Sequence, residues 1–229
     1  ILTTFNPWWQ NGVVPKAFVK EFHRSSYYTC RKSLLSDLRR IVVMSGARRT
    51  GKTTIMYQLI HDLLEQGVKP QNILFFTFDH PLIRMAGMDQ VLNIYKNNIS
   101  DDAHFYMFVD EVQFDKDWTN YLKMAYDMNP DMRSVATGSA SAAIEDDVRE
   151  SGAGRWTVIK VTTLSFYEYC ALKGISKAQS VDDVFRIPTL SKQQQTQLMM
   201  GLSDLQIHLM RYMQIGGFPE LVKTEDVPY

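Results

Sequence analysis

The 229-residue sequence contains little cysteine and no excess of either charge. Its two cysteines, Cys30 and Cys170, argue against a disulfide framework and favour a reducing compartment, the cytoplasm. The 25 basic and 25 acidic residues balance, which excludes a uniformly basic, DNA-coating surface. No apolar run is long enough to span a membrane, and no Cys/His spacing is typical of a metal site, so neither a membrane nor a Cys/His-bound metal is expected.

Short apolar runs instead alternate with segments of helix length, the pattern of an α/β protein with a parallel sheet. The runs predict five strands: Ile41–Met44, Ile73–Phe78, Phe105–Val109, Arg133–Thr137 and Trp156–Val161. The segments between the first four predict helices over Thr53–Gln66, Leu82–Asn98 and Trp118–Asp127. We therefore place the core of the protein at residues 40–172.

Residues 1–39 are expected to form an N-terminal strap and helix. The strap is irregular around Asn6–Trp9 and Val13–Pro15, and Arg31–Arg39 forms a short helix. Trp8 and Trp9 are expected to anchor the strap on the core, although aromatic residues here could also stack on a base.

Residues 173–229 are expected to form a helical lid or annex. A helix over Ser165–Leu172 precedes it, and the polar stretch Lys173–Ser191 follows as a linker or loop. A longer helix ends at Gly216-Gly217, where glycine commonly terminates a helix. Its expected apolar face consists of Leu198, Leu202, Leu205, Leu209 and Met213.

The first strand leads into a phosphate-binding motif. Gly46-Ala47-Arg48-Arg49-Thr50-Gly51-Lys52-Thr53 fits G-x-x-x-x-G-K-[ST] without a mismatch, and Thr54 follows it into a helix. The glycines allow a tight turn that directs backbone N–H groups inward, and the helix adds the positive end of its dipole. Lys52 is expected to reach the β- and γ-phosphates, and the Thr53 hydroxyl to ligate Mg²⁺. The motif predicts an ATP site.

Arg48 and Arg49 occupy variable positions of this motif. We interpret them as a solvated, electropositive rim, which we favour over a catalytic role in the same subunit.

The third predicted strand ends in two carboxylates, Asp110 and Glu111. A strand buried on both faces ends in acids where the carboxyl edge of the sheet is exposed, and ligands bind at this edge. Asp110 is expected to hold Mg²⁺ and Glu111 to act as the general base on an attacking water. Because an adjacent base implies water as the nucleophile, the pair favours hydrolysis.

The fourth strand leaves the sheet through Thr137-Gly138-Ser139. The hydroxyl of Thr137 or Ser139 is placed to sense the γ-phosphate. The alternative is that Ser139 or Ser141 caps a helix, a position that serine favours.

These residues together resemble a known family. The segments that carry the resemblance occur in the order Asn6-Pro7-Trp8-Trp9, GARRTGKTT, Asp110-Glu111-Val112-Gln113, Thr137–Ser141, Gly154-Arg155, Leu164–Tyr169 and Gly216-Gly217-Phe218-Pro219-Glu220. They are similar to the predicted AAA+ superfamily ATPases of archaea and bacteria that usually carry a C-terminal domain of unknown function.

The resemblance implies a three-layer P-loop NTPase core with the strand order 5-1-4-3-2, a helical lid, and ATP with Mg²⁺ as ligands. It carries over the roles of Lys52, Thr53, Asp110 and Glu111. Arg155 would contact the γ-phosphate, in this subunit or a neighbour, unless it is an ordinary surface arginine. For Gln113 we favour a solvated turn over a role in orienting water or in coupling the site to a partner.

The sequence therefore predicts an ATP-hydrolysing enzyme. The alternatives are a nucleotide-gated switch with slow turnover and a small-molecule kinase. A homo-oligomer is a possible assembly, and the macromolecular target, protein or nucleic acid, is unknown. The family usually continues beyond the Gly-Gly-Phe-Pro-Glu segment, so we expect the part that chooses a target to lie outside these residues.

Overall fold

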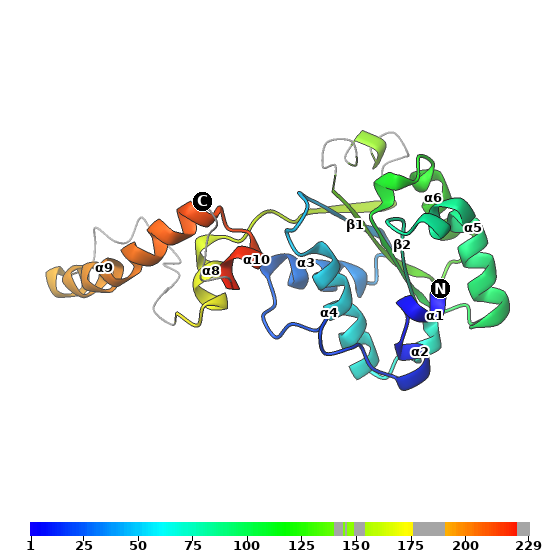
Figure 1. The fold of residues 1–229 in the computed structure, drawn as a ribbon, viewed down its shortest axis with the longest axis horizontal. Helices are drawn as coiled ribbons and strands as arrows, with labels where there is room; N and C mark the ends of the chain where they lie inside the picture. Colours follow the sequence, from blue (N-terminus) through cyan, green and yellow to red (C-terminus); the bar gives the residue numbers. More distant parts are fainter. Residues whose placement is uncertain (140–143, 145, 149–153, 176–190, 224–229) are drawn as a thin grey trace. The chain divides into compact units, whose positions relative to one another are not determined.

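The computed structural model describes residues 1–139, 144, 146–148, 154–175 and 191–223, without the side chains of 197–199, 201–204 and 223. Five parallel strands form one sheet in the order β2-β3-β4-β1-β5, which confirms the expected order (Figure 1). The strands are β1 (Ile41–Ser45), β2 (Ile73–Thr77), β3 (Tyr106–Asp110), β4 (Arg133–Gly138) and β5 (Trp156–Lys160). Each begins within one residue of its predicted start.

Helices cover the sheet on both sides, which explains why its strands are continuous apolar runs. α3 (Ser25–Leu34) and α4 (Lys52–Glu65) contact each other on one side, and α5 (Pro81–Asn98) and α6 (Trp118–Met128) contact each other on the other (Figure 1). α4 buries the stripe Ile55, Met56, Leu59, Ile60 and Leu63, as its spacing predicts. The short helices η1 (Pro70–Asn72) and η2 (Val112–Phe114) precede β2 and follow β3.

The helix expected at Arg31–Arg39 is wrong in its position, because α3 begins six residues earlier and ends at Leu34. Its buried face is Tyr27, Cys30 and Leu34, a helical spacing that the prediction overlooked. Arg39 lies beyond the helix, where its guanidinium donates to the carbonyl oxygens of Tyr126 and Asn129, both at 2.9 Å.

The N-terminal residues form two short helices, α1 (Leu2–Phe5) and α2 (Trp8–Asn11), in place of the irregular strap expected there. They lie along β2, the edge strand (Figure 1). The indole N–H groups of Trp8 and Trp9 both donate to the carbonyl of Ile73, at 3.0 and 2.8 Å. Both tryptophans are buried, so the expectation that they anchor this segment is confirmed.

Asn6, between these two helices, pairs with the same strand. Its Oδ1 accepts from the Phe75 N–H at 2.6 Å, and its Nδ2 donates to the Phe75 carbonyl at 2.7 Å. Asn6 is fully buried. The N-terminal segment thus provides hydrogen-bond partners that a neighbouring strand would otherwise supply.

The chain divides into two compact units, Ile1–Val161 and Thr162–Tyr229. This division groups residues 1–39 with the sheet and residues 162–172 with the helices that follow. The second unit contains α8 (Phe166–Leu172), α9 (Lys192–Ile215) and α10 (Pro219–Lys223). Most of the polar stretch Lys173–Ser191 lies outside the described residues.

Within the second unit, α9 ends at Gly216 in the left-handed conformation, as the sequence predicts. The Tyr212 hydroxyl donates to the Leu164 carbonyl at 2.7 Å and joins α9 to the segment before α8. Of the expected apolar face, Leu205 is buried, whereas Leu209 and Met213 are exposed; the side chains of Leu198 and Leu202 are not described. Across the described helices, none has the length and apolar character of a membrane span.

Candidate nucleotide-binding site

The phosphate loop connects β1 to α4 and depends on its glycines. A Cβ atom on Gly46 would lie 2.1 Å from the carbonyl oxygen of Val161, the residue that follows β5. No other residue therefore fits at position 46 unless the backbone at Val161 moves. Gly51 caps α4 with φ of 92°, and Arg49 has φ of 65°, both in the left-handed region. These turns leave Ala47, Arg48 and Arg49 exposed at the tip of the loop.

Two side chains of the motif, Lys52 and Thr50, hold the loop in shape. The Lys52 ammonium donates to the carbonyls of Gly46 and Ala47, each at 2.8 Å, and the Thr50 hydroxyl donates to Ala47 at 2.9 Å. Burial lowers the pKa of Lys52, and the carboxylates of Glu111 and Asp110 oppose that shift.

Arg24 is a site residue that the sequence did not reveal. It is buried, and its guanidinium donates to the Thr50 carbonyl at 2.7 Å from outside the loop. The phosphate-loop motif contains no position for it because it belongs to the N-terminal segment.

Asp110 lies at the end of β3, next to the start of α4. The Thr53 hydroxyl donates to its Oδ2 at 2.9 Å, and the Thr137 hydroxyl donates to its Oδ1. Burial raises the pKa of the Asp110 carboxyl, while these two hydrogen bonds lower it. The sheet therefore brings together Thr53 and Asp110, the two residues assigned to Mg²⁺.

Glu111 has left-handed backbone dihedral angles, with φ of 56° and ψ of 48°. This conformation costs a residue with a side chain about 1–2 kcal/mol. The chain turns here from β3 into η2, and the Glu111 N–H donates to the Thr137 hydroxyl at 3.1 Å. Strain of this kind is found most often at functional positions.

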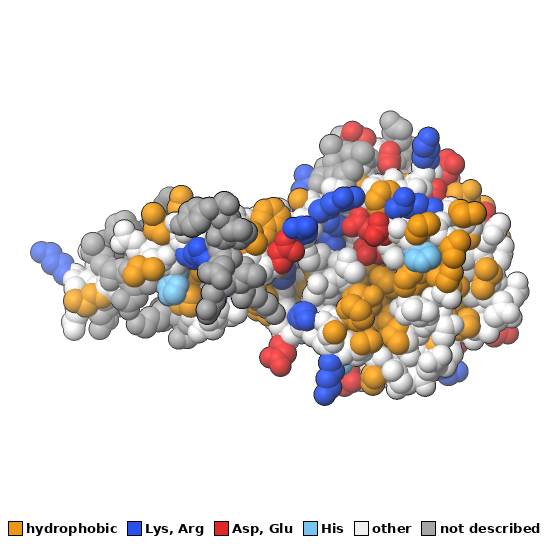
Figure 2. Space-filling view, in the orientation of Figure 1, with side chains coloured by type: hydrophobic (Ala, Val, Ile, Leu, Met, Phe, Trp, Pro, Cys, Tyr) orange, Lys and Arg blue, Asp and Glu red, His pale blue; other side chains and the backbone are white. Residues whose placement is uncertain are grey.

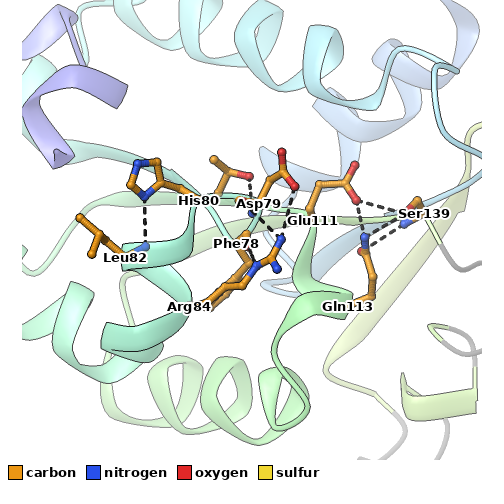
Figure 3. Close-up of polar contacts among 9 residues, drawn as sticks. Phe78, Asp79, His80, Leu82, Arg84, Glu111, Gln113 and Ser139 are labelled. Atoms are coloured by element: carbon orange, nitrogen blue, oxygen red, sulfur yellow. Dashed lines mark hydrogen bonds and ion pairs between the residues drawn. The ribbon is translucent and has the colours of Figure 1, made fainter.

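The Glu111 carboxylate is held by Gln113 and Ser139 (Figure 3). The Gln113 amide donates to Glu111 Oε2, and the Ser139 hydroxyl donates to the same atom at 3.1 Å. The interpretation of Gln113 as part of a solvated turn is therefore wrong. The sequence held one indication of this contact: Gln113 is a polar residue only two positions after Glu111, the expected base.

Both hydroxyls proposed as sensors lie in this cluster, and they contact different carboxylates. Thr137, fully buried, bonds Asp110 and the Glu111 backbone, whereas Ser139 bonds the Glu111 side chain. Ser141, proposed as a helix cap, lies outside the described residues.

Arg155 lies away from this cluster, so the chain does not bring it to its own phosphate loop, which was one of the alternatives left open for it. It precedes β5, whose first residue Trp156 pairs with Ile41 at the start of β1, and the phosphate loop follows the other end of β1. Its guanidinium pairs with Asp127, Nε to Oδ1, at 3.1 Å.

A cavity of about 410 Å³ opens beside Thr53, Asp110 and Glu111. Its other walls are Arg48, Thr77, Asp79 and the rings of Phe5, Tyr57, Phe75 and Phe114. Figure 2 shows acidic, basic and hydrophobic side chains gathered next to one another on one face of the sheet-bearing unit. The cavity is thus lined by polar and charged side chains together with four aromatic rings.

These residues fit a metal-bound nucleoside triphosphate. The hydroxyl of Thr53 and the carboxylate of Asp110 are hard oxygen donors, which Mg²⁺ prefers. Arg48 lines the cavity next to them. Thr53 and Thr54 lie in the first turn of α4, a 14-residue helix whose N-terminus favours an anion.

The sheet order and the loop define a P-loop NTPase fold of the AAA+ type. Residues 38–170, more than half of the chain, match the family model described as "AAA domain". The chain therefore belongs to the AAA domain family, as the resemblance implied.

The relatives that this chain matches by sequence are uncharacterized, so they indicate no activity. An uncharacterized protein of Haemophilus influenzae is 28% identical over 193 residues, which are 81% of this chain and 41% of that protein. Uncharacterized protein MJ1637 of Methanocaldococcus jannaschii is 23% identical over 86% of this chain and 41% of its own length. The chain thus spans about two fifths of these relatives.

Among solved structures, the ORC1 protein of Aeropyrum pernix, in complex with DNA, has a TM-score of 0.51. It is 12% identical, and the match covers 80% of this chain and 56% of ORC1. At this identity the similarity concerns the fold alone.

Proposed function

We propose that the protein binds ATP with Mg²⁺ and hydrolyses it. The observation that carries the proposal is the arrangement at the carboxyl edge of the sheet. There, Thr53 is hydrogen-bonded to Asp110, and Glu111 follows beside the same cavity. A phosphate loop without a carboxylate base would support binding only.

Lys52, Thr53 and Asp110 would hold the substrate. The Lys52 ammonium exchanges its bonds to the loop carbonyls for bonds to phosphate oxygens, and the exposed loop provides backbone N–H groups. Thr53 and Asp110 hold Mg²⁺, which supplies positive charge at the phosphate oxygens.

Glu111 would act on the water. Its carboxylate accepts a proton from the water while the water oxygen bonds to the γ-phosphorus. The bond between that phosphorus and the β–γ bridging oxygen breaks, and ADP and phosphate leave.

Phosphoryl transfer to a small acceptor is the second candidate function. The cavity of about 410 Å³ that opens beside Thr53, Asp110 and Glu111 is also lined by the rings of Phe5, Tyr57, Phe75 and Phe114, which an organic acceptor could contact. Release of inorganic phosphate from ATP without any acceptor distinguishes hydrolysis from transfer.

Glu111→Gln tests the hydrolysis proposal. Glutamine keeps the shape of the side chain but does not accept the proton, so single-turnover hydrolysis should slow by about 10²–10⁴-fold. The ATP dissociation constant should stay close to that of the parent. A parental rate in this variant means that the base is elsewhere.

Asp110→Asn is the matched comparison for that experiment. It changes the neighbouring carboxylate in the same way, but it should weaken the Mg²⁺ dependence of ATP binding itself.

Turnover far below the ordinary range of about 1–10³ per second in the parent would favour the slow nucleotide-gated switch.

A further inference from the structure

The Glu111 carboxylate is anchored through one oxygen only. Gln113 Nε2 and Ser139 Oγ both donate to Oε2, and among the described residues no other donor reaches this side chain. Figure 3 shows the second oxygen pointing away from Gln113 and Ser139. One carboxylate oxygen is thus held while the other remains available.

The Gln113 amide makes three hydrogen bonds in this arrangement. Its Nε2 donates to Glu111 Oε2 and, at 2.8 Å, to Ser139 Oγ, while its Oε1 accepts from the Ser139 N–H at 3.2 Å. This uses both amide hydrogens and the amide oxygen. Gln113 therefore joins the proposed base, which directly follows β3, to the residue that follows β4.

The fold keeps the amide of Gln113 in this place. Gln113 is the middle residue of η2 and lies between Val112 and Phe114. Val112 is fully buried, and the ring of Phe114 packs against Arg84, with its centroid 3.9 Å from the guanidinium carbon. A Cβ atom on Gly138 would lie 2.5 Å from Ile144 Cδ1 and 3.3 Å from Gln113 Oε1, so glycine at this position leaves room for both side chains.

We propose that Gln113 is a positioning residue that holds the Glu111 side chain with one oxygen bound and the other free to take the proton from water. The inference rests on the proposed hydrolysis, with Glu111 as its base. Without the Gln113 amide, the Glu111 carboxylate keeps only the Ser139 hydroxyl as a donor, and Ser139 itself loses its bonds to the amide, so the Glu111 side chain can populate other rotamers. Small misplacements of a reacting group cost up to about a hundredfold in rate.

Gln113→Met is the variant that tests this role, because it keeps the length of the side chain and removes both donors. Single-turnover hydrolysis should slow by about 10- to 100-fold, with the ATP dissociation constant changed less than about twofold. Gln113→Asn keeps an amide that is one methylene too short, and it should also slow hydrolysis. Gln66→Met, at the exposed end of α4, is the control and should retain the parental rate.

A double-mutant cycle with Glu111→Gln separates positioning from a merely structural role. Because Gln113 acts through Glu111, Gln113→Met should change the rate of the Glu111→Gln protein by less than about twofold. An equal slowing in both backgrounds, or parental rates for Gln113→Met and Gln113→Asn, would overturn the inference and leave the hydrolysis proposal intact. If Glu111→Gln itself keeps the parental rate, the proposed base and its positioning residue both fall.

Discussion

Lys52 supports the phosphate loop through its hydrogen bonds to the carbonyls of Gly46 and Ala47. Lys52→Ala removes the ammonium that we expect to bind phosphate, and a charged hydrogen bond contributes about 1.5–3 kcal/mol. ATP affinity should therefore fall roughly tenfold to a hundredfold, measured by calorimetry with Mg²⁺. Lys32→Ala, which removes an exposed lysine of α3, should bind ATP as the parent does.

The residues that were predictable from the sequence are those whose chemistry requires a fixed spacing. The phosphate-loop motif identifies Lys52 and Thr53, and an apolar run ending in two acids identifies Asp110 and Glu111. Gln113 and Arg24 were not predictable in this way, because their roles depend on how η2 and the N-terminal segment fold back toward the site. The placement of Arg155 likewise depends on the register of β5 with β1.

Among the elements, the N-terminal segment makes the clearest test of stability. Asn6→Ala removes both partners of the Phe75 backbone, and burying an unpaired polar group costs about 1–3 kcal/mol. We expect the free energy of unfolding to fall by about 2–4 kcal/mol, measured as a lower urea midpoint with an unchanged slope. Asn11→Ala, which removes an exposed hydrogen bond to Val13, should change it by less than about 0.5 kcal/mol.

The strands were predictable to within a residue or two because a buried parallel strand leaves a short, dense apolar run. The helix α3 was misplaced because most of Ser25–Leu34 is polar, and of its hydrophobic residues only Tyr27, Cys30 and Leu34 pack inward while Tyr28 is exposed. Asn6 could not be assigned at all, since its partner Phe75 is 69 residues away in the chain. The local sequence pattern is enough to predict a strand or a helix. The residues that this element contacts depend on how distant segments of the chain are arranged in the fold.

At the scale of the whole molecule, the position of Arg155 bears on assembly. It lies at the edge of the sheet opposite its own phosphate loop, so only a head-to-tail interface would bring it to a nucleotide, that of a neighbour. If such an interface forms, Mg²⁺ with a non-hydrolysable ATP analogue should promote self-association in analytical ultracentrifugation. Arg155→Ala should reduce that association, and Lys32→Ala should not. A strict monomer whose activity is independent of protein concentration would exclude this assembly.

The pairing of the N-terminal segment with β2 also has a consequence for solubility. The outer edge of β2 carries backbone groups at Ile73 and Phe75 that are now bonded to Trp8, Trp9 and Asn6. An uncovered strand edge of this apolar character is a template for intermolecular strand addition. We therefore expect the first dozen residues to protect the chain from fibrillar aggregation, and we expect proteolytic removal of these residues to expose β2 to strand addition and cross-β assembly.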